Sequence, residues 1–178
     1  STNDIFVYDY TVMDGLALKA SYTPSDGSAA VDSSMDYGLL YTGMEGLSLY
    51  AAMGENNNQP TSGITGKADL SMFGVKYAMG AITLGYQINE TDSGTANEDE
   101  DFTAMGVSYA LSDDLSVSLN MSEIDFESAT EDQEATGVSF SYTSGGMTIS
   151  GTHSTIDNQN GTATADNTGY ELNFVFSF

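Results

Sequence analysis

The chain has 178 residues, a length that suits one domain, and it carries 26 acidic residues against three lysines, for a formal net charge of −23. This excess of negative charge argues against nucleic acid and anionic membrane surfaces as partners, and it makes cations the natural counter-charge. The sequence has no cysteine and no apolar run near the ~20 residues that a membrane helix needs. A disulfide scaffold, thiol chemistry and a helical membrane protein are therefore excluded.

Alternation of apolar and polar residues recurs along the whole chain and predicts an all-β protein. No segment shows the competing period of a helix. We predict eleven strands, at residues 4–13, 15–24, 34–42, 46–54, 67–79, 81–91, 101–111, 114–126, 134–143, 146–156 and 168–178.

Taken in chain order, these strands have one apolar side and one polar side. The first two carry on their apolar sides Phe6, Tyr8, Tyr10, Val12, Leu16, Leu18, Ala20 and Tyr22. Strand 114–126 shows the pattern best, with Leu115, Val117, Leu119 and Met121 alternating with Ser116, Ser118, Asn120 and Ser122. Such segments suit a sheet with lipid on one face and water on the other.

The connections fall into two classes that alternate along the chain. Short turns are expected at 13–15, 43–46, 80–81, 112–114 and 144–146, and longer polar loops at about 25–33, 55–66, 92–100, 127–133 and 157–167. Tight turns at one end and long loops at the other are typical of outer-membrane barrels. We therefore predict an antiparallel transmembrane β-barrel, with residues 1–178 forming a single barrel segment.

The last strand ends the chain with an aromatic face, formed by Tyr170, Leu172, Phe174, Phe176 and Phe178, opposite a face that carries Glu171, Asn173 and Ser177. This ending resembles the closing strand of bacterial outer-membrane β-barrels, which typically stop at a C-terminal Phe. The resemblance implies that Tyr170, Phe174, Phe176 and Phe178 form the signal that the barrel assembly machinery reads. The chain departs from the pattern at Asn173, about where a glycine is often found.

The whole chain is similar to the Gram-negative general diffusion porins, which have sixteen strands, and within them to the alphaproteobacterial type. Strand–turn–strand units such as Tyr109-Ala-Leu-Ser-Asp-Asp-Leu-Ser-Val-Ser-Leu119 carry this resemblance together with the terminus. It implies an outer-membrane homotrimer, with the C-terminus in the periplasm and lipid and lipopolysaccharide around it. The constriction loop and the lumen arginines of that family are not visible in this sequence.

An odd number of strands would place the two chain ends on opposite sides of the membrane, whereas barrels of this kind have an even number. We therefore expect a C-terminal part of a longer porin, because losing five strands and the constriction loop from sixteen leaves eleven. The opening Ser1-Thr-Asn-Asp4 has neither the basic region nor the apolar core of a signal peptide, which fits a mature or cut chain.

Pore-lining candidates follow from strand phase, since the polar sides would face a water-filled lumen. They are Asp9, Lys19, Asp36, Lys76, Gln87, Asn120 and Glu171. Ionised groups in such a lumen stay hydrated, and their field biases which ions enter. We expect a passive channel for small hydrophilic solutes and ions, with a preference for cations, and we expect no catalytic residues and no required cofactor.

Other interpretations remain open. The loop carboxylates Glu98, Asp99, Glu100 and Asp101 are either solvated or bound to Ca²⁺ or Mg²⁺ that bridges to lipopolysaccharide or to a neighbouring loop. The same acidity also suits a calcium-stabilised surface or adhesin-like β-protein, which would dissolve without detergent. An outer-membrane hydrolase would need His153, the only histidine, whose own strand offers only hydroxyl groups as partners.

Overall fold

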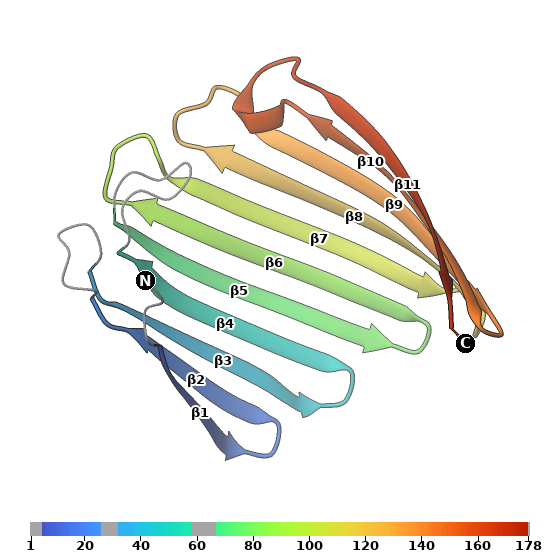
Figure 1. Cartoon of the computed structure of the whole chain (residues 1–178), viewed down its shortest axis with the longest axis horizontal. Coiled ribbons are helices and arrows are strands. Elements are labelled where there is room, and N and C mark those ends of the chain that lie inside the picture. The colour runs from blue at the N-terminus through green and yellow to red at the C-terminus, as the bar shows by residue number, and fades with distance from the viewer. Residues whose placement is uncertain (1–4, 26–31, 58–66, 178) are drawn as a thin grey trace. The chain divides into compact units, whose positions relative to one another are not determined.

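The computed structural model describes residues 5–25, 32–57 and 67–177, and these residues form eleven strands and one short 3₁₀ helix (Figure 1). The strands are β1 (Phe6–Met13), β2 (Leu16–Thr23), β3 (Ser34–Met44), β4 (Leu47–Asn56), β5 (Ala68–Met79), β6 (Ile82–Ser93), β7 (Glu100–Ala110), β8 (Leu115–Phe126), β9 (Gln133–Ser144), β10 (Met147–Asp157) and β11 (Asn167–Phe176). Each strand is hydrogen-bonded to the next in sequence, in the order β1 to β11.

The strand prediction is confirmed for all eleven elements, with small differences at their ends. β4 and β6 each run two residues further than expected, to Asn56 and Ser93, because backbone pairing continues where the side chains have become polar. The loop after β10 contains the 3₁₀ helix η1 (Gln159–Gly161), which the alternation pattern did not predict. Asn158 and Asn160 adopt left-handed backbone angles there, which Asn tolerates better than most residues.

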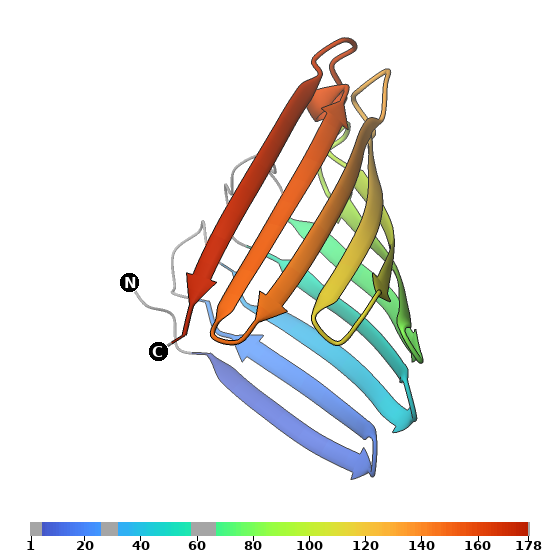
Figure 2. The same ribbon diagram turned by 90° about the vertical axis from the view of Figure 1, so that its right-hand side faces the viewer.

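Among the described residues, the strands are joined by the two expected classes of connection; residues 26–31 and 58–66, which belong to two of the predicted long loops, lie outside them. Gly15 lies in the tight turn after β1 with φ of 77°, a backbone angle that favours glycine. Gly80, with φ of 59°, is the first residue of the two-residue turn between β5 and β6. Figure 2 shows β9, β10 and β11, in orange and red, side by side, with a tight turn at one end and the η1 loop at the other.

Contacts group the chain into two compact units, which we describe separately. Unit 1 contains β1 to β4, the first part of β5, the second part of β6, and the residues around the loop ends of β7 and β8. Unit 2 contains the end of β5, the start of β6, most of β7 and β8, and all of β9 to β11.

In unit 1 the register of β1 to β4 separates apolar from polar side chains. One cross-strand row on the apolar face contains Tyr8, Ala20, Tyr37 and Met53. The next row, on the opposite face, contains Asp9, Lys19, Gly38 and Ala52. The register therefore realises the two-sided pattern that the sequence predicts.

Unit 2 has the same organisation from β8 to β11. Its apolar face contains the row Val117, Phe140, Gly151 and Leu172 and the row Leu119, Val138, His153 and Tyr170. Its polar face contains the row Ser118, Ser139, Thr152 and Glu171 and the row Ser116, Ser141, Ser150 and Asn173. A shift of one residue in any of these pairings would exchange the two faces, so the burial pattern fixes the register.

The apolar faces are not packed against other parts of the described chain. Ala68 is the only apolar side chain that is buried among the described residues, whereas Phe6 is 66% and Tyr170 89% exposed. The accessible surface is 11680 Å². A folded soluble monomer of this mass would expose about 8,300 Å². No helix among the described residues is long and apolar enough to cross a membrane.

Candidate pore-lining face

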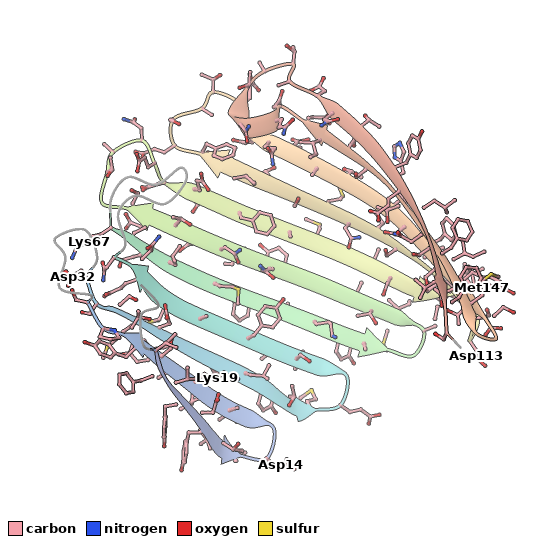
Figure 3. All side chains as sticks on the ribbon, in the orientation of Figure 1. Asp14, Lys19, Asp32, Lys67, Asp113 and Met147 are labelled. Atoms are coloured by element: carbon pink, nitrogen blue, oxygen red, sulfur yellow. The ribbon has the colours of Figure 1, made fainter. Side chains whose placement is uncertain are left out.

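The polar face of unit 1 carries charges of both signs. Asp9 and Lys19, the second of which is labelled in Figure 3, lie opposite each other on β1 and β2, and their side chains form an ion pair of 3.1 Å. Asp36 on β3 accepts a hydrogen bond of 2.7 Å from the Ser21 hydroxyl. Its carboxylate occupies the space that a Cβ at Gly54 on β4 would need. The missing side chain at Gly54 therefore makes room for the acidic group.

A neutral hydrogen-bonded group lies on the same face. The Tyr50 hydroxyl donates to the Gln87 side-chain oxygen over 3.3 Å, and the Gln87 amide donates to Asn89 over 3.0 Å. The Tyr50 ring lies over Gly74, where any Cβ would collide with it. A glycine on β5 thus allows an aromatic ring from β4 to lie flat and to reach β6.

In unit 2 the polar face consists mainly of hydroxyl and amide groups. The Asn120 side chain covers Gly106 on β7, and the Ser118 and Ser139 hydroxyls are 3.3 Å apart. At the far end of the face, the Asn173 amide donates to Glu171 over 2.8 Å. These groups bind water well, and they bear no charge except at Glu171.

The structure places all seven predicted pore-lining residues on polar sides of their strands. Asp9 and Lys19 are brought into direct contact. Asn120 and Glu171 lie on β8 and β11 of unit 2, separated by β9 and β10. Lys76 is two residues beyond Gly74 on β5 and so shares its side of the strand. Whether these residues line a pore stays a prediction.

Tyr50 and Gly54 were missed by the sequence reasoning, although both shape this face. Their strand phase was available, because Tyr50 and Gly54 alternate with the apolar Leu49 and Met53 on β4. What the sequence lacked was the register that brings Tyr50 beside Gln87 and Gly54 beside Asp36.

Asp99 and Glu98, two of the four loop carboxylates that the sequence suggests as metal ligands, accept hydrogen bonds in the structure. Asp99 accepts a hydrogen bond of 2.7 Å from the Ser93 backbone N–H, and Glu98 accepts one from the Ser93 hydroxyl. Glu100 and Asp101 are the first residues of β7, so their side chains point to opposite faces. Within residues 5–25, 32–57 and 67–177, no three potential ligands gather at a metal-binding distance.

Many acidic residues lie on the apolar faces, near the loop ends of the strands. In unit 2, Glu123, Glu134 and Asp157 stand in one cross-strand row. In unit 1, Glu90 and Asp92 continue the apolar side of β6 after Ile88. The net charge of the chain is therefore a poor guide to the charge of the polar face.

Outside the strands, one ion pair links the loop ends of β3 and β5. Lys67 Nζ lies 2.8 Å from Asp32 Oδ2, and both residues are exposed. The hydrogen bond from Lys67 lowers the pKa of Asp32 below its ordinary value, and the same bond raises the pKa of Lys67. Figure 3 shows this pair at the opposite end of unit 1 from the Asp14 turn.

His153 lies on the apolar face of β10, between Val138 and Tyr170. Neither cross-strand neighbour is a base, a nucleophile or an acid of the kind that a hydrolytic triad needs. The proposed assembly residues Tyr170, Phe174 and Phe176 share one side of β11, while Phe178 lies outside the described residues.

A sheet of sequential antiparallel strands, with one polar face and one uncovered apolar face, is typical of outer-membrane β-barrel proteins. A family model for the Gram-negative porin matches residues 1–132, and the chain belongs to that family. The comparison with curated proteins gave no match.

Solved porins share the fold. The anion-selective porin from Comamonas acidovorans matches with a TM-score of 0.80 at 15% identity, over 99% of this chain and 60% of that one. A porin structure refined at 1.8 Å resolution matches with a TM-score of 0.74 at 15% identity, over 99% of this chain and 62% of that one. The trimer form of in-vitro folded OmpT, an outer membrane protein of Vibrio cholerae, gives 0.64 at 16% identity, with coverages of 98% and 64%. The chain thus spans less than two thirds of the length of these proteins.

Proposed function

We propose that this chain forms part of the wall of an outer-membrane channel through which small hydrophilic solutes and ions diffuse passively. The observation that carries the proposal is that, in the registered strand pairs, apolar side chains predominate on one face and polar side chains on the other, away from the acidic loop ends. Exposed apolar faces of this extent mark a membrane or protein interface. Hydroxyl, amide and charged groups on the other face suit a water-filled passage.

The proposal includes a preference for cations, and its support comes from particular side chains. On the polar faces Asp9 is paired with Lys19, which leaves Asp36 and Glu171 as acidic groups against Lys76. The Comamonas acidovorans porin is anion-selective, so the fold does not determine the sign. The sign depends on lumen charges, and among the seven predicted pore-lining residues the unpaired sum is negative by one.

Conductance in a planar bilayer under a salt gradient tests both parts of the proposal. We expect ion-conducting steps and a reversal potential of the sign that cation preference gives. In Asp36→Asn/Glu171→Gln the potential should move toward anions, because two negative charges are removed from the polar faces while Lys76 remains. A bilayer without current would refute the channel, and an unchanged potential in the double variant would refute the role of these two residues.

We further propose that the assembled protein is a homotrimer in contact with lipid and lipopolysaccharide, delivered by the barrel assembly machinery, with its C-terminus in the periplasm. The trimer form of the related OmpT supports the oligomeric state. Crosslinking in detergent would test the trimer. A band at three times the mass of one chain is the expected result, and a band at the mass of a single chain would contradict it.

The alternative, an acidic surface or adhesin-like β-protein, predicts solubility without detergent. The uncovered aromatic side chains of β1 and β11 favour the membrane protein. Detergent-dependent solubility with heat-dependent gel migration is the expected result, and a monodisperse protein in plain buffer would support the alternative.

A further inference from the structure

A groove of about 570 Å³ lies in unit 1, on the apolar side of the strands rather than on the polar face. Its floor is formed by Tyr22, Met35, Tyr37 and Met53. The register pairs Tyr22 with Met35 and Tyr37 with Met53, which places all four on the apolar face of β2, β3 and β4. The volume is within the range of about 300–1,000 Å³ that is usual for small-molecule sites.

The loop-side edge of this groove is acidic. Four carboxylates from three strands line it: Glu55, Asp69, Glu90 and Asp92. Glu90 on β6 accepts a hydrogen bond of 3.2 Å from Ser71 on β5, so these two side chains lie on the same face of the sheet and both line the groove. The described residues that line the groove include no basic side chain, and the nearby Lys67 is already paired with Asp32 at 2.8 Å.

This arrangement differs from the acidic rim elsewhere on the apolar faces. The row of Glu123, Glu134 and Asp157 in unit 2 is also acidic, but none of its members borders this groove. At the groove, four carboxylates line the same cavity as two aromatic rings and two thioethers. The two tyrosine rings of the floor also attract cations through their π faces.

We propose that the groove binds a cationic amphiphile, with one alkyl chain on the Tyr22–Met53 floor and a protonated amine at the carboxylate edge. The occupant follows from charge complementarity, because an anionic head group would be repelled by Glu55, Asp69, Glu90 and Asp92. A protonated amine donates up to three hydrogen bonds, and carboxylates on three different strands are available to accept them. The site lies on the apolar face, so it is separate from the proposed channel.

Dodecylamine is a suitable probe, since it is a single alkyl chain with a protonated amine at neutral pH. Its binding to the full chain in a neutral detergent is measured by native mass spectrometry, with dodecyl sulfate as the anionic counterpart. The test variant is Glu90→Gln/Asp92→Asn. The matched control is Glu123→Gln/Glu134→Gln, which removes two carboxylates from the same kind of face in unit 2, away from the groove.

We expect one saturable dodecylamine site, weakened about tenfold or more in the test variant and unchanged in the control, since the test variant loses charge-assisted hydrogen bonds to the amine. Heat-dependent gel migration confirms folding, and the single variant Asp92→Asn replaces the double one if that fails to fold. Equal binding by test and control variants would overturn the proposal. Tighter binding of dodecyl sulfate with Mg²⁺, lost in the test variant, would overturn it in favour of an anionic amphiphile bridged by metal.

Discussion

Two neighbouring residues on β9 allow a direct test of which face meets lipid. Val138 pairs with Leu119 and His153 on the apolar face, and Ser139 pairs with Ser118 and Thr152 on the polar face. Val138 is 53% exposed, so much of its side chain contacts lipid or solvent rather than other described residues. We therefore compare Val138→Arg with Ser139→Arg, which add the same charge one residue apart.

The expected costs differ because the two side chains enter different solvents. An arginine on the lipid face near the membrane midplane costs about 2–4 kcal/mol, or about 30- to 900-fold in the folding equilibrium. Ser139→Arg loses the hydrogen bond between Ser118 and Ser139, worth about 0.5–1.5 kcal/mol, but keeps its charge in water. Val138→Arg should therefore be the more destabilising variant.

Urea unfolding of the vesicle-inserted protein measures both costs, with tyrosine fluorescence as the signal because the chain has no tryptophan. Far-UV circular dichroism of the same samples confirms that the starting states have equal strand content. If Ser139→Arg proves as costly as Val138→Arg, or more so, the assignment of faces is wrong. Reversal potentials of the Ser139→Arg protein should also move toward anions, since the new charge would face the channel.

Three further predictions concern single contacts. Gly74→Val should destabilise the fold by about 1–3 kcal/mol because its side chain meets the Tyr50 ring, whereas Gly85→Val, with nothing within 4 Å of its Cβ position, should cost less in urea unfolding; equal costs would refute the contact. NMR titration should give a pKa of Asp32 below the ordinary 3.8 that rises in Lys67→Met. The stability that the Asp32 carboxylate contributes is present above the pKa that it has in the unfolded chain. It is lost as the pH falls through the lower pKa that it has in the folded chain. The stability that the pair gives through Lys67 is present below pH 10.5 and is lost as the pH rises through the raised pKa of Lys67. An unchanged pKa of Asp32 in Lys67→Met would contradict both pH dependences. Asp9→Asn should release Lys19 and move the reversal potential toward anions, and Asp9→Asn/Lys19→Gln should restore it; no difference between them would exclude a lumen role for the pair.

The strands could be predicted from the sequence because a side-chain period of two is visible wherever one face is apolar. The loop ends could not, since the apolar side of β6 continues after Ile88 with Glu90 and Asp92. The sequence prediction ends this strand at residue 91 because Asp92 and Ser93 are polar, while the backbone ladder continues to Ser93. If the alternation is continued beyond Ile88, it places Glu90 and Asp92 on the apolar face of β6.

The candidate site divides in the same way. Phase along a strand sufficed to place Asp36 and Gln87 on polar sides. It could not show that Gln87 accepts a hydrogen bond from Tyr50, because that contact depends on the register of separate strands. Nor could it show that Asp36 fills the space left by Gly54. Local pattern determines which way a side chain points, and only strand pairing determines what it touches.

The row of Glu123, Glu134 and Asp157 implies a gradient of stability along the hairpins of β8, β9 and β10. Like charges directly opposite each other on neighbouring strands weaken the pairing. At the other end of the β9–β10 hairpin, a tight glycine turn holds the strands together. The pairing of β9 and β10 should therefore form first at the turn and extend toward the loop. At low ionic strength the loop ends of these strands should be the first part to open, because their carboxylates repel one another more strongly.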